Sequence, residues 1–76
     1  MRQSVRVAVE KAVRSIDRNL LTQISWQGVH LPSINLDDQD LRALDLRDAK
    51  LEKASFKRAK LDEADLQAAD LRGAQL

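Results

Sequence analysis

The sequence contains no cysteine, which excludes a disulfide framework and a thiolate metal site. Glycine is scarce, with only Gly28 and Gly73, so a glycine-rich phosphate loop is excluded as well. His30 is the single histidine, and no serine lies in a nucleophile elbow, so the residues for nucleophilic catalysis are missing. No apolar run approaches the roughly 20 residues that span a bilayer. These absences predict a cytoplasmic protein that is not an enzyme and has no cofactor, no metal and no transmembrane segment.

A large apolar residue recurs at every fifth position through the second half of the chain. The repeat centres are Leu36, Leu41, Leu46, Leu51, Phe56, Leu61, Leu66, Leu71 and Leu76. A small residue stands two places before most of them, as at Ala49, Ala54 and Ala59. Neither an α-helix, which turns about 100° per residue, nor a flat alternating strand keeps residues five apart on one face. A chain that turns a corner every five residues does so, and the spacing therefore predicts a β-solenoid.

Three units carry a resemblance to a known family. Ala64-Asp65-Leu66, Ala69-Asp70-Leu71 and Leu44-Asp45-Leu46 resemble the Ala-(Asp/Asn)-Leu-x-x signature of pentapeptide-repeat proteins, and the register continues over about nine units. The resemblance implies a mainly β fold: a right-handed quadrilateral parallel β-helix with four fives per coil and a narrow core of leucines and alanines.

Charged residues twenty apart test the coil length without reference to the family. Side chains that stack in neighbouring coils, about 4.8 Å apart, should avoid like charges. The opposite pairs at this spacing are Asp37 with Lys57, Asp38 with Arg58, Asp40 with Lys60, Arg42 with Asp62, Lys50 with Asp70 and Glu52 with Arg72. Asp45 with Asp65 is the one like pair, whereas a spacing of fifteen gives four opposite and four like pairs. The charges therefore favour twenty residues per coil.

Residues 1–24 follow another pattern and are predicted to form an amphipathic capping helix, from about residue 4 to 21. Apolar residues recur at spacings of three and four, at Val5, Val9, Ala12, Val13, Ile16, Leu20 and Ile24, and Ser4 is a candidate N-cap. A short strand is the alternative, because Val5, Val7 and Val9 alternate with other residues. The first coil of a solenoid exposes apolar core and unpaired backbone, which such a helix would cover. Its outer face could also bind a partner helix or a membrane surface, since residues 1–30 carry a net charge of 5 − 2 = +3.

Residues 25–35 are predicted to form the transition to the repeats, which occupy residues 36–76 in about two coils. Trp26 continues the register backward from Leu36 and is expected to plug the end of the core beneath the helix. Gln39 stands where the repeat has a small residue. It should either find backbone partners inside the core or mark a local bulge.

The last coil is expected to end in an exposed edge. Phe56, Leu71, Ala74 and Leu76 are the predicted C-terminal interface, used either for end-to-end homodimerisation or for continuation into a longer solenoid. The predicted function is a non-catalytic structural scaffold or protein-protein interaction module.

The alternative comes from the resemblance, which implies a DNA mimic that modulates or protects DNA gyrase. Residues 31–76 carry a net charge of only 8 − 10 = −2, in too few coils to imitate a duplex. Direct nucleic-acid binding is not expected either, since no aromatic platform is interleaved with the basic residues.

Overall fold

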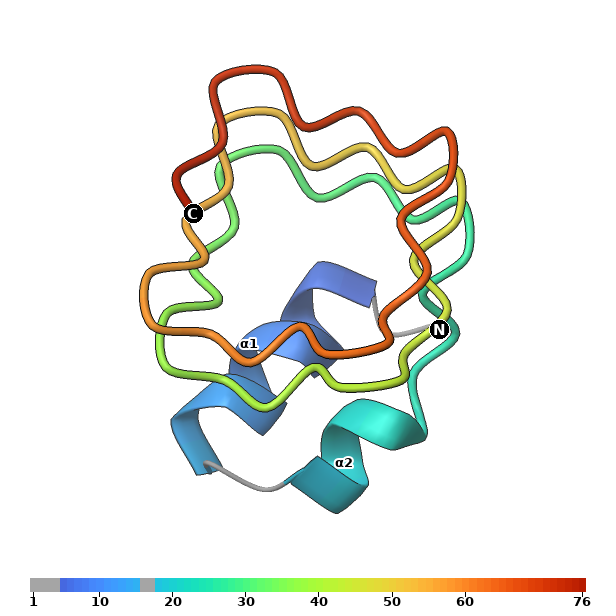
Figure 1. Ribbon diagram of the computed structural model, residues 1–76. Coiled ribbons are helices and arrows are strands. Elements are labelled where there is room, and N and C mark those ends of the chain that lie inside the picture. The colour runs from blue at the N-terminus through green and yellow to red at the C-terminus, as the bar shows by residue number, and fades with distance from the viewer. Residues whose placement is uncertain (1–4, 16–17) are drawn as a thin grey trace.

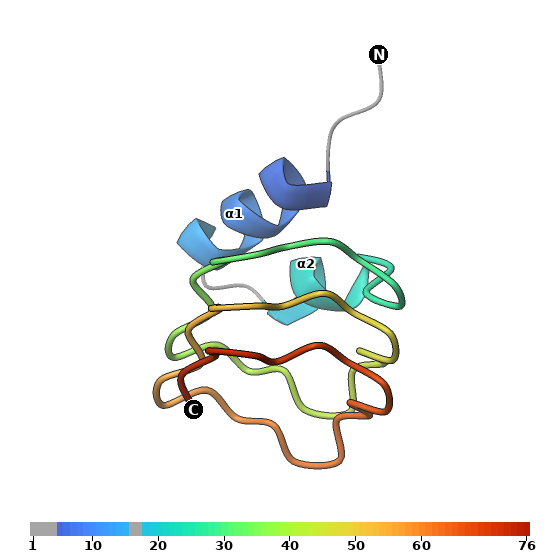
Figure 2. The same cartoon turned by 90° about the horizontal axis from the view of Figure 1, so that it is seen from above.

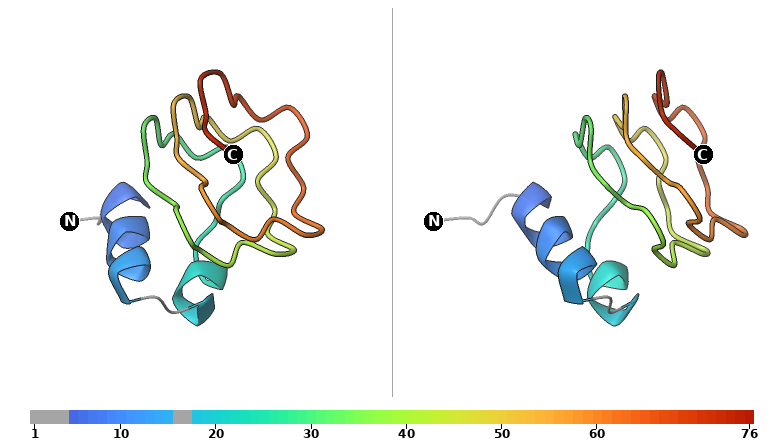
Figure 3. Two further views of the ribbon diagram at one scale, coloured as in Figure 1. Left: turned by 60° about the vertical axis from the view of Figure 1, so that its left-hand side comes forward. Right: turned by 90° about the vertical axis from the view of Figure 1, so that its left-hand side faces the viewer.

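A computed structural model describes residues 5–15 and 18–76. Two helices come first, α1 (Val5–Ser15) and α2 (Arg18–Thr22), and the chain then winds into a coil that continues to residue 76 (Figure 1). Seen from above, successive turns of the coil lie side by side, with the helices beside the first turn (Figure 2). The final turn therefore lies at the end opposite to the helices (Figure 3).

Each turn of the coil contains twenty residues, as the charge pairs predict. Parallel bridges join residues twenty apart: His30 with Lys50, Asn35 with Ser55, Asp40 with Lys60, Asp45 with Asp65, Lys50 with Asp70 and Ser55 with Gln75. Two kinds of backbone hydrogen bond hold neighbouring turns together. The N–H of a repeat centre, such as Leu41, donates to the carbonyl nineteen residues on, Lys60, at 2.9 Å. The N–H of Lys60 in turn donates to the carbonyl of Gln39, also at 2.9 Å.

Every five-residue unit ends in a tight turn at a corner of the coil. The carbonyl of the repeat centre accepts a hydrogen bond from the N–H three residues on, as Leu46 does from Ala49 at 3.2 Å. The third residue of each four-residue turn has a positive φ, between 60° and 64° at Ser33, Asp38, Ala43, Asp48, Lys53, Arg58, Glu63 and Ala68, and 71° at Gly28 and Gly73. A hydrogen-bonded turn with positive φ at this position is a type II turn, which ordinarily favours glycine there.

The expected quadrilateral β-helix is therefore seen only in part. Parallel pairing, the twenty-residue turn and the regular corners are present, but the bridges are isolated and no extended strand or sheet forms within residues 5–15 and 18–76. The reason is geometric, because two residues of every five lie in a corner and a single bridging residue is left on each face. The described residues therefore contain parallel bridges but not the extended strands that the expectation of a mainly β protein implied.

The expected single capping helix is replaced by two helices that contact each other, α1 and α2. The hydroxyl of Ser15, the last residue of α1, donates to the carbonyl of Lys11 at 3.1 Å. Such a bond competes with the backbone ladder and slightly destabilises the last turn of α1. Ser4 and Ile16, part of the expected cap and apolar stripe, lie outside the described residues.

The helices and the coil share one apolar core. Val9, Ala12 and Leu21 are buried from the helices, and the coil contributes the inward-pointing repeat centres and small residues. Trp26 is buried beneath the helices, as expected, and its ring N–H donates to the carbonyl of Leu21 at 2.9 Å. Gln39 is inside as well, 6% exposed, with its amide donating to the carbonyl of Asp37 at 3.2 Å. Of the two predictions for Gln39, the structure therefore agrees with a backbone partner inside the core and not with a local bulge.

Candidate interaction surface

Burial along the coil changes abruptly after Phe56. The five repeat centres from Leu36 to Phe56 are at most 2% exposed. Leu61, Leu66 and Leu71 are only half-buried, and Leu76 is 79% exposed. A residue in the coil is covered by the residue twenty positions later, so in this chain the side chains from residue 57 onward have no covering turn among the described residues. We call the uncovered side of residues 57–76 the end face.

The structure corrects one member of the predicted C-terminal interface. Leu71, Ala74 and Leu76 belong to the end face, but Phe56 is 2% exposed because its counterpart one turn on is Leu76. Leu61 and Leu66, predicted as core repeat centres, pack against the core and also form part of the end face. The twenty-residue lag was the signal that could have placed all of them.

The end face also presents backbone groups. In earlier turns, the N–H groups of Leu41 and Ala43 donate to the next turn, and the carbonyl of Gln39 accepts from it. Their counterparts on the end face are the N–H groups of Arg58, Leu61, Glu63, Leu66, Ala68, Leu71, Gly73 and Leu76, and the carbonyls of Ala59, Ala64, Ala69 and Ala74. Within the described residues, none of these groups makes a backbone–backbone hydrogen bond. The face is thus an apolar centre inside a rim of available hydrogen-bonding groups.

The opposite end of the coil is closed by two arginines from the helices. Arg6 of α1 donates to the carbonyl of Pro32. Arg18 of α2 donates to the carbonyl of Asp40 at 3.0 Å and to the carbonyl of Arg42 at 2.7 Å, and it pairs with the Asp40 carboxylate at 3.1 Å. These guanidinium groups occupy the edge of the first turn, where no preceding turn of the coil exists among the described residues.

The aspartate before many repeat centres secures the corner that follows. Its carboxylate accepts the backbone N–H two residues on, at Asp40, Asp45, Asp65 and Asp70, and Asn35 does the same with its amide oxygen. This is an Asx-turn, which satisfies a corner N–H that the coil leaves without a backbone acceptor. At the unit centred on Phe56 the residue is Ser55, and the N–H of Lys57 is instead accepted by Asp37 of the turn before, at 2.9 Å.

Arginine forks neutralise several of these carboxylates. Arg47 donates to both oxygens of Asp45 at 2.8 Å, and this hydrogen bonding lowers the pKa of Asp45 to about 2. Arg42 likewise donates to both oxygens of Asp40, at 2.8 and 2.7 Å. These hydrogen bonds, together with the nearby charge of Arg18, hold the pKa of Asp40 well below its usual range. Five of the ten carboxylates of the coil are therefore ion-paired: Asp38, Asp40, Asp45, Asp65 and Asp70.

The pairs predicted across neighbouring turns are partly visible as contacts. Arg58 meets Asp38, twenty residues earlier, at 2.7 Å. The one like pair, Asp45 with Asp65, is bridged by Arg47, which lies 2.8 Å from Asp45 and 3.8 Å from Asp65. The cation between them explains how two aspartates are tolerated one above the other.

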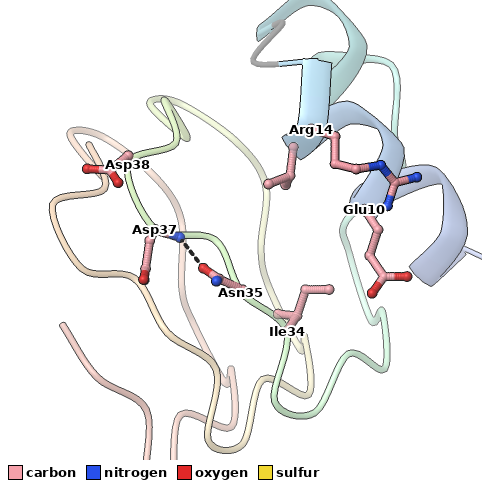
Figure 4. Close-up of a pocket in the computed structure, with 7 residues that line it drawn as sticks. Glu10, Arg14, Ile34, Asn35, Asp37 and Asp38 are labelled. Atoms are coloured by element: carbon pink, nitrogen blue, oxygen red, sulfur yellow. Dashed lines mark hydrogen bonds between the residues drawn. The ribbon is translucent and has the colours of Figure 1, made fainter.

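A groove of about 400 Å³ lies between α1 and the corner that follows Ile34 (Figure 4). Its lining residues are Glu10, Val13, Arg14, Ile34, Asn35, Asp37 and Asp38. The polar groups on the coil side are already engaged: Asn35 accepts the N–H of Asp37 at 2.9 Å, Asp37 is bound to Ser55, and Asp38 is bound to Arg58. The groove therefore offers a ligand less than the end face does.

The described residues do not bring metal-ligating side chains together. Within residues 5–15 and 18–76, no group of three or more His, Cys, Asp or Glu side chains is placed to hold a metal ion. His30 lies exposed on the outside of the first turn. Among the described helices none has both the length and the apolarity required to cross a membrane.

The repeat register is matched by a family described as Pentapeptide repeats, with 8 copies, over residues 21–58 and 40–76. The chain belongs to the pentapeptide-repeat family. This confirms the resemblance seen in the sequence. Proteins of this family are generally non-enzymatic structural or interaction proteins. Comparisons of this pentapeptide-repeat protein with curated proteins and with solved structures gave no match.

Proposed function

We propose that this pentapeptide-repeat protein is a non-catalytic interaction module and that the end face is its docking surface for another protein. The observation that supports this best is the drop in burial after Phe56, which leaves Leu61, Leu66, Leu71 and Leu76 together on one end of the coil. Apolar groups ringed by available backbone donors and acceptors are typical of protein-docking edges. In solution we expect the repeats to form the right-handed quadrilateral β-helix that the family resemblance implies, with α1 and α2 as its cap.

Substitution of the apolar centre tests the docking surface. Leu66→Lys places a charge on the half-buried end face. In a pull-down from host lysate, this variant should no longer capture partner proteins that the unchanged chain captures. Ala43→Lys puts the same side chain on an exposed corner of the first turn, away from the end face, and should leave capture intact. Circular dichroism of both variants separates lost binding from lost folding. Equal capture by Leu66→Lys and the unchanged protein would contradict the proposal.

A second copy of the chain is the occupant that the sequence predicts, and the homodimer stays a prediction. Size-exclusion chromatography with light scattering at tens of micromolar concentration tests it. A dimer that Leu66→Lys converts to a monomer would support self-docking through the end face. A strict monomer at the same concentration would contradict it.

DNA mimicry, the alternative drawn from the resemblance, finds less support. A mimic needs rows of uncompensated negative charge, whereas Asp38, Asp40, Asp45 and Asp70 are all held by arginines. A supercoiling assay with purified DNA gyrase tests it directly. We expect no inhibition and no protection at a large excess of the protein over the enzyme.

A further inference from the structure

The two ends of the coil differ in their backbone hydrogen-bonding groups. In each five-residue unit, two N–H groups and one carbonyl point toward the C-terminal side, as at Leu41, Ala43 and Gln39. Two carbonyls and one N–H point toward the N-terminal side, as at Lys60 and Asp62, whose carbonyls accept from the preceding turn at 2.9 Å. The coil is therefore rich in acceptors at its N-terminal end and rich in donors at its C-terminal end.

The N-terminal end shows how this fold closes an acceptor-rich edge. Arg6 and Arg18 donate to the carbonyls of Pro32, Asp40 and Arg42. The equivalent carbonyls one turn on, those of Glu52, Lys60 and Asp62, accept the N–H groups of Ser33, Leu41 and Ala43. The guanidinium groups thus stand in for the backbone donors of a preceding turn, while apolar residues of the helices cover the core.

On the end face, by contrast, N–H donors outnumber carbonyl acceptors. Its rim offers two N–H donors for each carbonyl, and the formal charges of residues 57–76 cancel at 4 − 4 = 0. The polarity of the face therefore comes from the backbone. Clustered backbone N–H groups attract anionic oxygens, and carboxylates make the stronger bonds with them.

A second copy matches this rim poorly. Two end faces placed against each other would bring one donor-rich rim onto another. Docking in the head-to-tail sense would require the acceptor-rich edge of the first turn, which Arg6 and Arg18 already occupy. Donors that are buried without acceptors cost about 1–3 kcal/mol each, which opposes both arrangements.

We propose that the end face binds an amphipathic, acidic helix of another protein. Its apolar stripe would cover Leu61, Leu66 and Leu71, and aspartate or glutamate carboxylates beside the stripe would accept the corner N–H groups of Glu63, Ala68 and Gly73. This helix is the chemical counterpart of the basic α1–α2 pair at the other end. The inference rests on the proposed function, to which it adds the chemistry of the partner.

Two synthetic peptides of about 15 residues, long enough to form a helix, test the proposal against the full chain. Both carry the same leucine stripe, flanked in one by glutamate and in the other by lysine. Isothermal titration calorimetry should show that the glutamate peptide binds at least about tenfold more tightly, which corresponds to one charge-assisted hydrogen bond. In ¹H–¹⁵N spectra, the amide signals of Ala68 and Gly73 should shift on binding.

Matched variants localise the effect. Ala68→Glu adds a negative charge to the rim and should weaken the glutamate peptide several-fold. Ala43→Glu makes the same change at the same exposed turn position in the first turn of the coil, where φ is 62° against 60° at Ala68, and should not. Glu63, with φ 62°, shows that glutamate is tolerated at this position.

The outcomes separate this inference from the proposed function. Tighter binding of the lysine peptide, equal weakening by the two variants, or a dimer that excludes both peptides would overturn the acidic partner while leaving the end face as a docking surface. A strict monomer that binds neither peptide would overturn the acidic partner, and equal capture by Leu66→Lys and the unchanged protein would overturn the docking surface as well.

Discussion

Replacement of the alanines at positive φ by glycine should stabilise the protein, against the usual effect of glycine. Ala43 and Ala68 have φ values of 62° and 60° and lie exposed at corners of the coil. An L-residue in the left-handed region costs about 1–2 kcal/mol relative to the right-handed region. Glycine avoids this cost but loses about 0.5–1 kcal/mol more conformational freedom on folding. The difference predicts a gain of about 0.5–1 kcal/mol in the free energy of unfolding for Ala43→Gly.

Thermal and urea unfolding followed by circular dichroism measures this gain. For a domain of this size it corresponds to a rise in Tm of about 2–8 °C. Ala8→Gly, within helix α1, is the control and should lose about 0.5–1 kcal/mol, because Ala8 has ordinary helical geometry. If Ala43→Gly and Ala8→Gly destabilise the protein equally, the strained corner is not a feature of the folded chain and the reasoning fails.

The natural glycines allow the reverse experiment. At Gly28 a Cβ would meet no heavy atom within 4 Å among the described residues, so Gly28→Ala tests backbone strain alone. At Gly73 a Cβ would lie 3.2 Å from Cγ of Lys53. Gly73→Ala should therefore lose at least as much stability as Gly28→Ala. An increase in stability for Gly28→Ala would count against the strain argument.

Three further predictions follow from the same structure. Arg18→Met removes the guanidinium that closes the first turn and should lower the free energy of unfolding by about 1–2 kcal/mol, whereas Met in place of the exposed Arg14 should change little; equal urea midpoints would refute the role of Arg18. Leu46→Ala, at a fully buried centre, should cost about 2–5 kcal/mol and Leu71→Ala, on the end face, clearly less; equal losses would mean that the end face is covered in solution. The folded-state pKa of Asp45 is lowered to about 2 from an ordinary value of 3.8. Its ionised carboxylate therefore contributes fully to the free energy of unfolding above about pH 5, and this contribution is lost as the pH falls toward 2. Urea unfolding at pH 6 and pH 3 should show this decline, reduced in Asp45→Asn; an identical decline in the variant would assign it to other carboxylates.

The order of charges along the chain predicted twenty residues per turn of the coil, because charged side chains twenty apart are neighbours in adjacent turns. Asp38 and Arg58 are far apart in sequence, yet their opposite signs at a lag of twenty anticipated the ion pair between them. The same lag explains why Phe56 was misplaced: the repeat pattern identifies inward residues but does not by itself say which of them has a neighbour above. Burial in the coil depends on the residue twenty positions on, and Phe56 has Leu76 there.

The presence of two helices, α1 and α2, was not predictable from apolar spacing, because steps of three and four residues run from Val5 to Ile24 without interruption. Likewise, no sequence rule would assign positive φ to Lys53 or Arg58, since neither residue favours it. The corner at Lys53 is held from both neighbouring turns, since the carbonyl of Glu52 accepts from Ser33 and the N–H of Lys53 donates to Arg72, both at 2.8 Å. The corner at Arg58 is held from the preceding turn, where the N–H of Asp38 donates to the carbonyl of Lys57 at 2.8 Å. Such contacts between turns outweigh the local preference of the residue.

The sequence alone determined the family, the five-residue register and the inward position of the repeat centres, because a periodic apolar pattern can be buried in very few ways. The tertiary structure decided which of those centres are covered, how the arginines of the helices replace a missing turn, and which backbone groups remain available at each end. Those properties depend on contacts between residues about twenty positions apart. They become visible only when one turn of the chain lies on the next.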